Sequence, residues 1–340
     1  MKKINIVDFL SERELTPVID VRSPAEFKKG HIPGAFNIPL FSDEERAVVG
    51  TKYVQESRYS SVIAGLDFVG SKLSGFVSEA SRIAPNKKIL VYCWRGGMRS
   101  ASMSWLLDLA GFNSKALVGG YKSYRRSIKN YLSKPSKLII LGGMTGSGKT
   151  ELLLELSRRG QQIIDLEGLA NHKGSAFGAI GQKPQPTTEF FENLLFEAFF
   201  KLDINKPIWV EDESKAIGSV FIPLEFFAQM ISSPVIAIER PPKTRVKRLT
   251  DEYTKCNPQH LIDSVNKISK RLGYDNANWA IKKIEEGNFE EAVEVSLKYY
   301  DKAYLYGLSN KKNKPIVCSF NDEDISLNCS FLIDTLNELH

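Results

Sequence analysis

The sequence predicts an α/β protein of two domains, each organised around a parallel sheet. Along most of the 340 residues, short apolar runs alternate with helical stretches, which is typical of parallel strands joined by crossover helices. The polar segment 131–137 contains Pro135 and interrupts this pattern, so it is expected to link a domain of residues 1–130 to one of residues 138–340. Residues 243–306 are expected to be mostly helical. Strands are expected at residues 18–21, 36–38, 88–92, 116–118, 138–141, 162–164, 208–210, 235–238 and 316–318.

The composition is that of a folded protein, since 42% of the residues are hydrophobic and 25% are charged. No run of about 18 apolar residues occurs, so neither a transmembrane helix nor membrane association is expected, and the N-terminal stretch lacks the pattern of a secretory signal. Four scattered cysteines argue against a disulfide framework, and four histidines do not cluster into a zinc site. We therefore expect a cytoplasmic protein. The net charge of +6 fits a polyanionic partner without requiring one.

A cysteine stands at the start of a glycine-rich loop in the segment 91–100, Val-Tyr-Cys-Trp-Arg-Gly-Gly-Met-Arg-Ser. Cys93 directly follows an expected strand, and a helix is expected to start near Ser100. Glycines let backbone amides turn toward the loop, and the helix N-terminus adds partial positive charge. These groups, with Arg95 or Arg99, would stabilise a thiolate and hold a tetrahedral anion. A small core residue is the alternative role for a cysteine. We predict a reactive Cys93 and an anion-binding loop made of Trp94, Arg95, Gly96, Gly97, Met98 and Arg99.

Three further segments accompany the cysteine loop: 20–27 (Asp-Val-Arg-Ser-Pro-Ala-Glu-Phe), 30–39 (Gly-His-Ile-Pro-Gly-Ala-Phe-Asn-Ile-Pro) and 119–121 (Gly-Gly-Tyr). Together with the loop they resemble a rhodanese domain over about residues 1–125. The resemblance implies a parallel-sheet domain that carries sulfur or selenium on the loop cysteine. Arg99 lies six positions after Cys93, whereas many sulfurtransferase loops are one residue shorter. The wider loop suits a phosphate that carries sulfur or selenium. Asp20 and Arg22 are expected to brace the loop or the strand end rather than react.

A complete phosphate-binding motif, Gly-Met-Thr-Gly-Ser-Gly-Lys-Thr, occupies residues 143–150 and fits G-x-x-x-x-G-K-[ST]. It follows the expected strand 138–141 and precedes a helical run, which is the context that the motif requires. Backbone amides would surround phosphate oxygens, Lys149 would reach the terminal phosphate, and Thr150 could bind Mg²⁺. The second domain is therefore expected to be a P-loop NTPase-like α/β domain with a helical C-terminal part. The predicted diphosphate site consists of Gly143, Met144, Thr145, Gly146, Ser147, Gly148, Lys149 and Thr150.

Three acidic residues follow another expected strand, at Glu211, Asp212 and Glu213. In a P-loop domain a carboxylate at the end of a neighbouring strand contacts the metal ion of the bound phosphates. Asp212 is the first choice for such a contact through water, and Glu211 is the second. No metal site formed by protein side chains alone is expected. A solvated acidic turn is the alternative.

Four stretches carry a second resemblance, which covers nearly the whole chain: 45–51 (Glu-Arg-Ala-Val-Val-Gly-Thr), 92–100, 165–178 (Asp-Leu-Glu-Gly-Leu-Ala-Asn-His-Lys-Gly-Ser-Ala-Phe-Gly) and 211–218 (Glu-Asp-Glu-Ser-Lys-Ala-Ile-Gly). In this order they resemble the tRNA 2-selenouridine synthase family, which joins a rhodanese domain to a P-loop domain. The resemblance implies a transferase that converts wobble 2-thiouridine of tRNA to 2-selenouridine. It implies a geranyl group placed on the sulfur from geranyl diphosphate, and then exchange of S-geranyl for selenium from selenophosphate. A selenophosphate-producing enzyme is a further partner to expect.

The two motifs fit the two implied steps. Alkylation turns a thiocarbonyl sulfur into a thioether-type substituent that can leave as a thiol. The phosphate motif could hold the prenyl donor, where Mg²⁺ and Lys149 would neutralise the departing pyrophosphate. The Cys93 loop could take or orient the selenium donor. An aromatic cluster at helical spacing could line the prenyl chain, although core packing is its expected role; it comprises Phe190, Phe191, Phe196, Phe199 and Phe200.

A basic segment between the two domains is the first candidate for tRNA binding. Residues 121–137 carry six basic residues and no acidic one. Lys122, Arg125 and Arg126 would contact phosphates, and Tyr124 would stack on an unstacked base. The alternative is a solvated basic helix.

Two other stretches are further candidates for tRNA contact. The run 240–248 could contact tRNA or cover the phosphate motif as a lid, with Arg245 and Arg248 as the residues concerned. His172 and Lys173 lie in a glycine-flanked polar loop that could contact phosphate or tRNA, or form a structural turn.

Three other functions remain open at the level of sequence. The chain could be a P-loop kinase whose rhodanese domain is a sensor, which requires nucleotide-dependent phosphoryl transfer. It could be a non-enzymatic sulfur or selenium carrier, which leaves the phosphate motif unexplained. A tRNA-binding scaffold leaves both motifs without a role.

Overall fold

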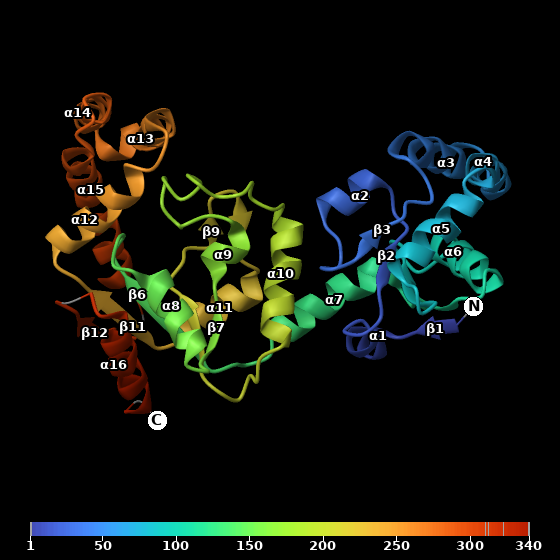
Figure 1. Ribbon diagram of the computed structural model, residues 1–340, viewed down its shortest axis with the longest axis horizontal. Helices are drawn as coiled ribbons and strands as arrows, with labels where there is room; N and C mark the ends of the chain where they lie inside the picture. The colour runs from blue at the N-terminus through green and yellow to red at the C-terminus, as the bar shows by residue number, and fades with distance from the viewer. Residues whose placement is uncertain (1, 310, 312, 322, 339–340) are drawn as a thin grey trace. The chain divides into compact units, whose positions relative to one another are not determined.

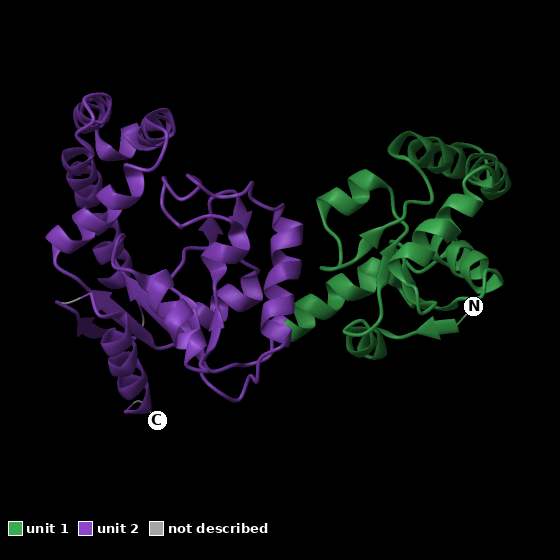
Figure 2. Cartoon of the chain, in the orientation of Figure 1, with its two compact units in different colours: residues 1–131 green, residues 132–340 purple. Residues whose placement is uncertain are grey.

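The computed structural model describes the following residues of the chain: 2–309, 311, 313–321 and 323–338. It divides into two compact units, Met1–Tyr131 and Leu132–His340, which Figure 2 shows in green and purple. Each unit contains its own five-stranded sheet (Figure 1). Helix α7 (Gly120–Leu132) runs across the division, so the predicted linker 131–137 begins inside a helix. The helix ends three residues before Pro135, as expected where a proline prevents helical continuation.

The sheet of the N-terminal unit has the strand order β1-β5-β4-β2-β3, and all of its strand pairs are parallel. Its strands are β1 (Lys2–Ile4), β2 (Val18–Asp20), β3 (Phe36–Asn37), β4 (Lys88–Tyr92) and β5 (Asn113–Leu117). The central strand β4 is buried from Ile89 to Tyr92, as in a sheet covered on both faces. The four strands predicted here are confirmed. Strand β5 starts earlier than expected because Asn113 already pairs with Lys88.

The remaining helices of the N-terminal unit are α1 (Ile6–Glu12), α2 (Pro24–Lys29), α3 (Asp43–Gln55), α4 (Arg58–Gly70), α5 (Leu73–Ile83) and α6 (Met98–Leu109). Helices α3 and α4 pack against each other between β3 and α5 in the chain (Figure 1). Ser42 begins α3 with a capping box, in which its side chain accepts a hydrogen bond from the Glu45 amide and the Glu45 carboxylate accepts one from the Ser42 amide.

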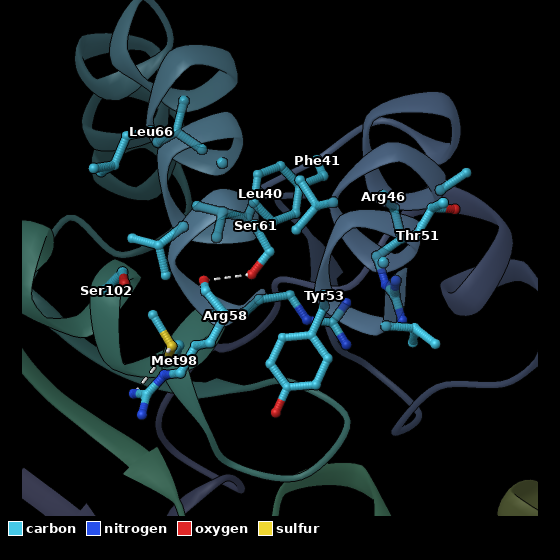
Figure 3. Close-up of a pocket in the computed structure, with 18 of the residues that line it drawn as sticks. Leu40, Phe41, Arg46, Thr51, Tyr53, Arg58, Ser61, Leu66, Met98 and Ser102 are labelled. Carbon is cyan, nitrogen blue, oxygen red and sulfur yellow. Dashed lines mark hydrogen bonds between the residues drawn. The ribbon is translucent and has the colours of Figure 1, made fainter. Parts of the chain in front are cut away.

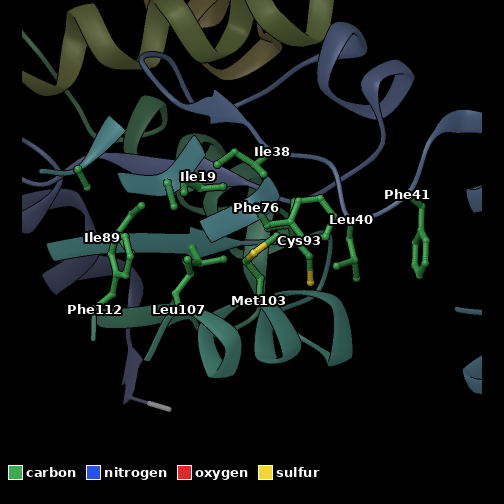
Figure 4. Close-up of a cluster of buried hydrophobic side chains, with 14 residues drawn as sticks. Ile19, Ile38, Leu40, Phe41, Phe76, Ile89, Cys93, Met103, Leu107 and Phe112 are labelled. Atoms are coloured by element: carbon green, nitrogen blue, oxygen red, sulfur yellow. The ribbon is translucent and has the colours of Figure 1, made fainter. Parts of the chain in front are cut away.

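The core of the N-terminal unit joins strands β2 and β4 to helices α5 and α6 (Figure 4). Ile19 and Val91 from the strands belong to the same buried cluster as Phe76 of α5 and Leu107 of α6. Cys93 belongs to this cluster and directly follows β4. The predicted reactive cysteine therefore stands on a rigid support, since its strand and the helix after it are both packed into the core.

The sheet of the C-terminal unit has the strand order β12-β11-β6-β8-β7 and is also parallel. Its strands are β6 (Leu138–Gly143), β7 (Gln162–Ile164), β8 (Ile208–Glu211), β11 (Val235–Glu239) and β12 (Ile316–Ser319). All five strands were predicted. A short antiparallel hairpin, β9 (Ala216–Ile217) and β10 (Val220–Phe221), lies outside this sheet. The carboxyl ends of β6, β7 and β8 meet at one edge of the sheet, where α/β proteins bind their ligands.

The helices of the C-terminal unit are α8 (Lys149–Arg158), α9 (Leu166–Ala170), α10 (Thr188–Phe200), α11 (Leu224–Ser232), α12 (Pro242–Tyr253), α13 (Pro258–Leu272), α14 (Tyr274–Glu285), α15 (Phe289–Ser309) and α16 (Ile325–Asn337). Helices α8 and α16 share a buried cluster with the sheet. Helices α12 to α15 form a second cluster, orange to red in Figure 1, which confirms the predicted helical region 243–306. Phe191, Phe196 and Phe199 of α10 are fully buried, so core packing is confirmed for them. In the part of the chain that the structure describes, no helix combines the length and the apolar character needed to cross a membrane.

Candidate active sites in the two units

The cysteine loop is fixed by a close approach of two backbones. Gly96 and Gly120 have φ values of +66° and +57°, which favour glycine. A Cβ atom on Gly120 would lie 2.2 Å from the carbonyl oxygen of Cys93, so no side chain fits there. The Tyr121 amide donates to that same oxygen at 2.8 Å, and the Lys122 amide donates to the Trp94 oxygen at 2.9 Å. The start of α7 therefore holds the loop in place.

Cys93 is buried, with only 3% of the residue exposed. Its Sγ atom is 3.2 Å from Oγ of Ser100, which lies in the first turn of α6. The Ser100 hydroxyl is also 3.2 Å from the carbonyl oxygen of Gly97. Helix α6 starts at Met98, two residues earlier than predicted, so its N-terminal amides lie directly beside the loop.

The two loop arginines differ in their surroundings. Nη1 of Arg99 donates to Oε2 of Glu26 at 2.6 Å, whereas Arg95 is exposed. Burial would raise the pKa of Glu26, but the hydrogen bond and charge of Arg99 outweigh it, so the pKa lies below its usual value. Glu26 therefore remains ionised and holds Arg99. Trp94 and Met98 are exposed at the surface of the loop.

Asp20 and Arg22 have the bracing role that was predicted for them. Nη2 of Arg22 lies 2.6 Å from Oδ2 of Asp20 and donates to the carbonyl oxygen of Gly30 at 2.7 Å. The guanidinium also lies 4.0 Å from the ring centre of Tyr121. Because both charged groups are buried and satisfied by each other, they position the strand end and the start of α7.

The phosphate loop follows β6, and Gly146 and Gly148 have φ values of +81° and +82°. Helix α8 starts at Lys149, so the amides of its first turn have no acceptor within the helix and are available to phosphate oxygens. Nζ of Lys149 donates to the carbonyl oxygen of Gly143 at 2.8 Å. Nε of Arg240 donates to the oxygen of Ser147 at 2.8 Å, which fixes the far side of the loop.

Two carboxylates converge on the hydroxyl of Thr150. Oγ1 of Thr150 lies 3.1 Å from Oε2 of Glu167 and 3.1 Å from Oε1 of Glu211. The Glu167 amide donates to Oε2 of Glu211 at 3.0 Å. Asp212 instead forms an ion pair with Lys311. The geometry thus reverses the order given to Asp212 and Glu211, because consecutive residues at the end of a strand point to opposite sides.

Glu213 is a third carboxylate of this cluster. A Cβ atom on Gly174 would lie 2.6 Å from Oε1 of Glu213 and 2.8 Å from Oε1 of Glu167, so the 165–178 loop brings these groups together. Burial and the charges of Glu167 and Asp165 raise the pKa of Glu211 to about 8. Burial and the charge of Glu167 also raise the pKa of Glu213. The cluster therefore resists carrying its full negative charge unless a cation is present.

These carboxylates fit a magnesium ion that is shared with a bound phosphate. Among the described residues, no group of three or more His, Cys, Asp or Glu side chains is arranged to hold a metal by itself. Magnesium in phosphate sites usually takes one or two protein ligands and completes its shell with water and phosphate oxygens. Thr150, with Glu211 and Glu167 through water, would hold it. Glu167 was not predicted from the sequence, although an acidic residue shortly after a parallel strand is a signal for this position.

The predicted tRNA contacts on α7 are only partly accessible. Tyr124 is fully buried and cannot stack on a base, which corrects its predicted role. It lies on a stripe with Tyr121, Ile128 and Leu132, all buried, so the helix turns its aromatic face to the core. Lys122 and Arg126 are exposed, and Arg125 is partly exposed, so the basic face of α7 remains available.

The arginines of α12 serve the phosphate loop rather than the surface. Arg245 is 2% exposed, donates to the Thr145 oxygen at 3.2 Å and forms an ion pair with Asp301, which corrects its prediction as a tRNA contact. Arg248 pairs with Glu151 of α8. The run 240–248 was expected either to contact tRNA or to cover the phosphate loop, and the geometry favours the second alternative.

The loop residues His172 and Lys173 lie beside the carboxylate cluster. His172 is buried, and a Cβ atom on Gly178 would lie 2.8 Å from its Nδ1. Burial lowers the pKa of His172. Lys173 is exposed and pairs with Glu252. Lys173 could therefore meet a ligand at the surface, whereas His172 packs within the loop.

Comparison with known proteins assigns both units. Residues 6–127 match the rhodanese-like domain, and residues 136–330 match the AAA domain of tRNA 2-selenouridine synthase. A tRNA 2-selenouridine synthase from Nitrosomonas europaea is 33% identical, with 88% of this chain and 91% of that protein covered. The chain belongs to the tRNA 2-selenouridine synthase family. Another tRNA 2-selenouridine synthase, from a Sulfurovum species, is 37% identical, with 86% of each chain covered.

Membership of the tRNA 2-selenouridine synthase family makes the chain an enzyme, so a non-enzymatic carrier and a scaffold are not supported. It also explains why a rhodanese-like unit and a P-loop unit occur in this order. Among solved structures, a rhodanese-related protein from Thermoplasma volcanium is 22% identical, covers 37% of this chain and 93% of that chain, and has a TM-score of 0.24.

Proposed function

We propose that this enzyme replaces the sulfur of wobble 2-thiouridine in tRNA by selenium in two steps, through an S-geranylated intermediate. The single observation that carries the proposal is the presence of a complete phosphate loop and a cysteine loop in one chain of this family. The first loop suits a diphosphate leaving group, and the second suits an anionic selenium donor. The substrates proposed are geranyl diphosphate and selenophosphate, the latter supplied by a separate selenophosphate-producing enzyme.

The first step is prenyl transfer at the phosphate loop. The thiouridine sulfur forms a bond to C1 of the geranyl group as the C1–O bond breaks, pyrophosphate leaves with the electron pair, and the N3 proton is released to water. Amides at the start of α8 bind the diphosphate, and Lys149 turns from the Gly143 oxygen to the departing phosphate. Mg²⁺ bound at Thr150 would neutralise further charge on the leaving group.

The second step is selenium exchange at the cysteine loop. Selenium of selenophosphate attacks C2, the C2–S bond breaks, and the geranyl sulfur leaves and takes up a proton. Water then cleaves the Se–P bond, which yields phosphate and the selenocarbonyl with its proton on N3. Selenium in selenophosphate is already fully reduced, so a bond from it to Cys93 sulfur would require an oxidant. We therefore assign Cys93 the donation of the proton to the geranyl sulfur, with loop amides and Arg95 orienting the donor.

The test is reconstitution with purified protein and tRNA that carries wobble 2-thiouridine, followed by mass analysis of nucleosides. With geranyl diphosphate alone, S-geranyl-2-thiouridine should accumulate. Addition of selenophosphate should convert it to 2-selenouridine, and selenophosphate without geranyl diphosphate should give none. Selenouridine formed at full rate without geranyl diphosphate contradicts the intermediate. A requirement for ATP in place of geranyl diphosphate favours the P-loop kinase alternative.

A further inference from the structure

The N-terminal unit contains a cavity of about 740 Å³ between helices α3, α4 and the start of α6 (Figure 3). This volume lies within the range of about 300–1,000 Å³ that is usual for small-molecule sites. Small side chains keep the space open at Ala47, Gly50, Ser61, Gly65 and Ser102. At Gly65, for example, an added Cβ atom would lie 3.2 Å from the ring of Phe41. The hollow is therefore built into the packing of α3 against α4.

The walls of the cavity are mainly apolar. Leu40, Phe41, Val49, Val62 and Val69 line it, and in Figure 3 the side chains of Leu40 and Phe41 point toward the space between the helices. Tyr53 and Leu66 also line it and are each 62% exposed. Exposed apolar side chains around a preformed hollow are typical of a site that binds an apolar group.

The charged residues of the cavity lining are all arginines: Arg46, Arg58 and Arg99. Glu26 compensates two of them, at 2.6 Å from Arg99 and 3.8 Å from Arg46. Nη2 of Arg58 lies 3.8 Å from Sδ of Met98, the contact drawn in Figure 3. Among the described residues, no carboxylate pairs with Arg58. The cavity thus combines apolar walls with positive charge at one side, which fits an apolar chain attached to an anionic molecule.

Part of the cavity lining belongs to the cysteine loop and the helix that follows it. Met98 and Arg99, the first two residues of α6, line it, and Ser102 follows one turn later. Cys93 lies five residues before Met98, and Ser100, which contacts its Sγ atom, is in the same first turn. A group bound in the cavity therefore lies beside the loop assigned to selenium exchange. By contrast, three of the α10 phenylalanines that were considered for a prenyl chain, Phe191, Phe196 and Phe199, are core residues.

We propose that this cavity binds the geranyl chain of the S-geranylated wobble nucleotide during selenium exchange, with Arg58 facing tRNA phosphate. The inference rests on the proposed function and adds to it the subsite that recognises the leaving group. Burying a ten-carbon chain strengthens binding, so geranylated RNA binds better than its precursor. The reacting C2–S bond is then presented to the cysteine loop.

The test compares two anticodon stem-loop RNAs, one with S-geranyl-2-thiouridine and one with 2-thiouridine at the wobble position. The wild-type protein should bind the geranylated RNA at least about tenfold more tightly. Ala47→Trp places a large side chain at the cavity wall and should abolish this preference, so that the two RNAs bind with equal affinity. Val48→Trp is the matched control, because Val48 is its neighbour on α3, is exposed and does not line the cavity. Leu66→Ser removes exposed apolar surface and should reduce the preference several-fold.

The outcomes separate the cavity from the proposed function. A wild-type protein without preference, or an Ala47→Trp variant that keeps the full preference, overturns the cavity assignment. If Ala47→Trp instead loses only the binding of free geranyl diphosphate, the cavity is the donor site and the assignment also fails. Conversion of the geranylated stem-loop to selenouridine is measured separately with wild-type protein. Failure there contradicts the exchange step, whereas the binding comparison still decides the cavity.

Discussion

The loop after β4 and the loop after β6 both join a buried parallel strand to a helix through glycines with positive φ, at Gly96 and at Gly146 and Gly148. Their surroundings differ. Buried carboxylates and buried arginines surround the phosphate loop, and the arginines donate to its carbonyl oxygens. An apolar cavity and accessible arginines adjoin the cysteine loop. The same local architecture therefore receives its chemistry from the side chains of neighbouring strands, loops and helices.

The largest expected effect that follows from this contrast is at the cysteine loop. Cys93→Ala should lower selenium exchange about 10²–10⁴-fold, because a positioned proton donor is lost. Geranylation should continue, so nucleoside mass analysis should find S-geranyl-2-thiouridine accumulating. Cys256→Ala, at a partly exposed cysteine outside both loops, should behave like wild type. Selenouridine formation at the wild-type rate by the Cys93 variant would contradict the assignment.

The second prediction concerns the phosphate loop. Lys149→Ala removes the positive charge at the departing pyrophosphate and should slow geranylation about 10²–10³-fold. Supplied with tRNA that is already geranylated, the variant should still exchange selenium at the wild-type rate. Lys183→Ala, at an exposed lysine remote in sequence from the loop, is a control of equal charge change. Equal loss of both steps in a folded, tRNA-binding Lys149 variant would mean that the two loops share one active centre.

A smaller effect is expected from the basic face of α7. Lys122→Glu combined with Arg126→Glu should weaken tRNA binding and reduce the slope of log affinity against log salt by about 1–2, because fewer counterions are released. Lys201→Glu with Lys206→Glu makes the same charge change at exposed sites of the other unit. The slope of this control should be steeper than that of the α7 variant. Filter binding at several salt concentrations measures both. An unchanged slope in the α7 variant would place the RNA contacts elsewhere.

The smallest effect is on stability near the carboxylate cluster. The pKa of Glu211 is about 8 in the folded state against an ordinary value of 4.5. The folded protein therefore holds this proton more tightly, and the free energy of unfolding falls as pH rises through this interval. Without Mg²⁺, Glu211→Gln should show a smaller decrease in melting temperature between pH 5.5 and 8.5 than wild type. Calorimetry measures the melting temperatures. If they fall equally with pH in the two proteins, Glu211 is not the cause of the pH dependence.

The strand that precedes each glycine loop could be predicted from the sequence, because each loop follows an apolar run, as at 138–141. The choice between Glu211 and Asp212 could not be predicted, because the sequence does not show which of the two side chains faces Thr150. The burial of Tyr124 was predictable from its helical spacing with Ile128, but the basic neighbours suggested an exposed role. The cavity depends on how α3 packs against α4, and its small residues show no pattern until the two helices meet.

Glu26 has a consequence of its own for the cysteine loop. Its carboxylate accepts from the Ser23 amide at 3.2 Å to cap α2, and it also neutralises Arg99 and faces Arg46. It is thus a resident anion that an incoming one must displace before Arg99 can respond. The affinity of the loop for the proposed donor would then depend on how strongly Glu26 holds Arg99, as well as on the contacts that the loop makes. Occupancy by the proposed donor would release Glu26 from Arg99, and so pass an event at the loop on to the first turn of α2.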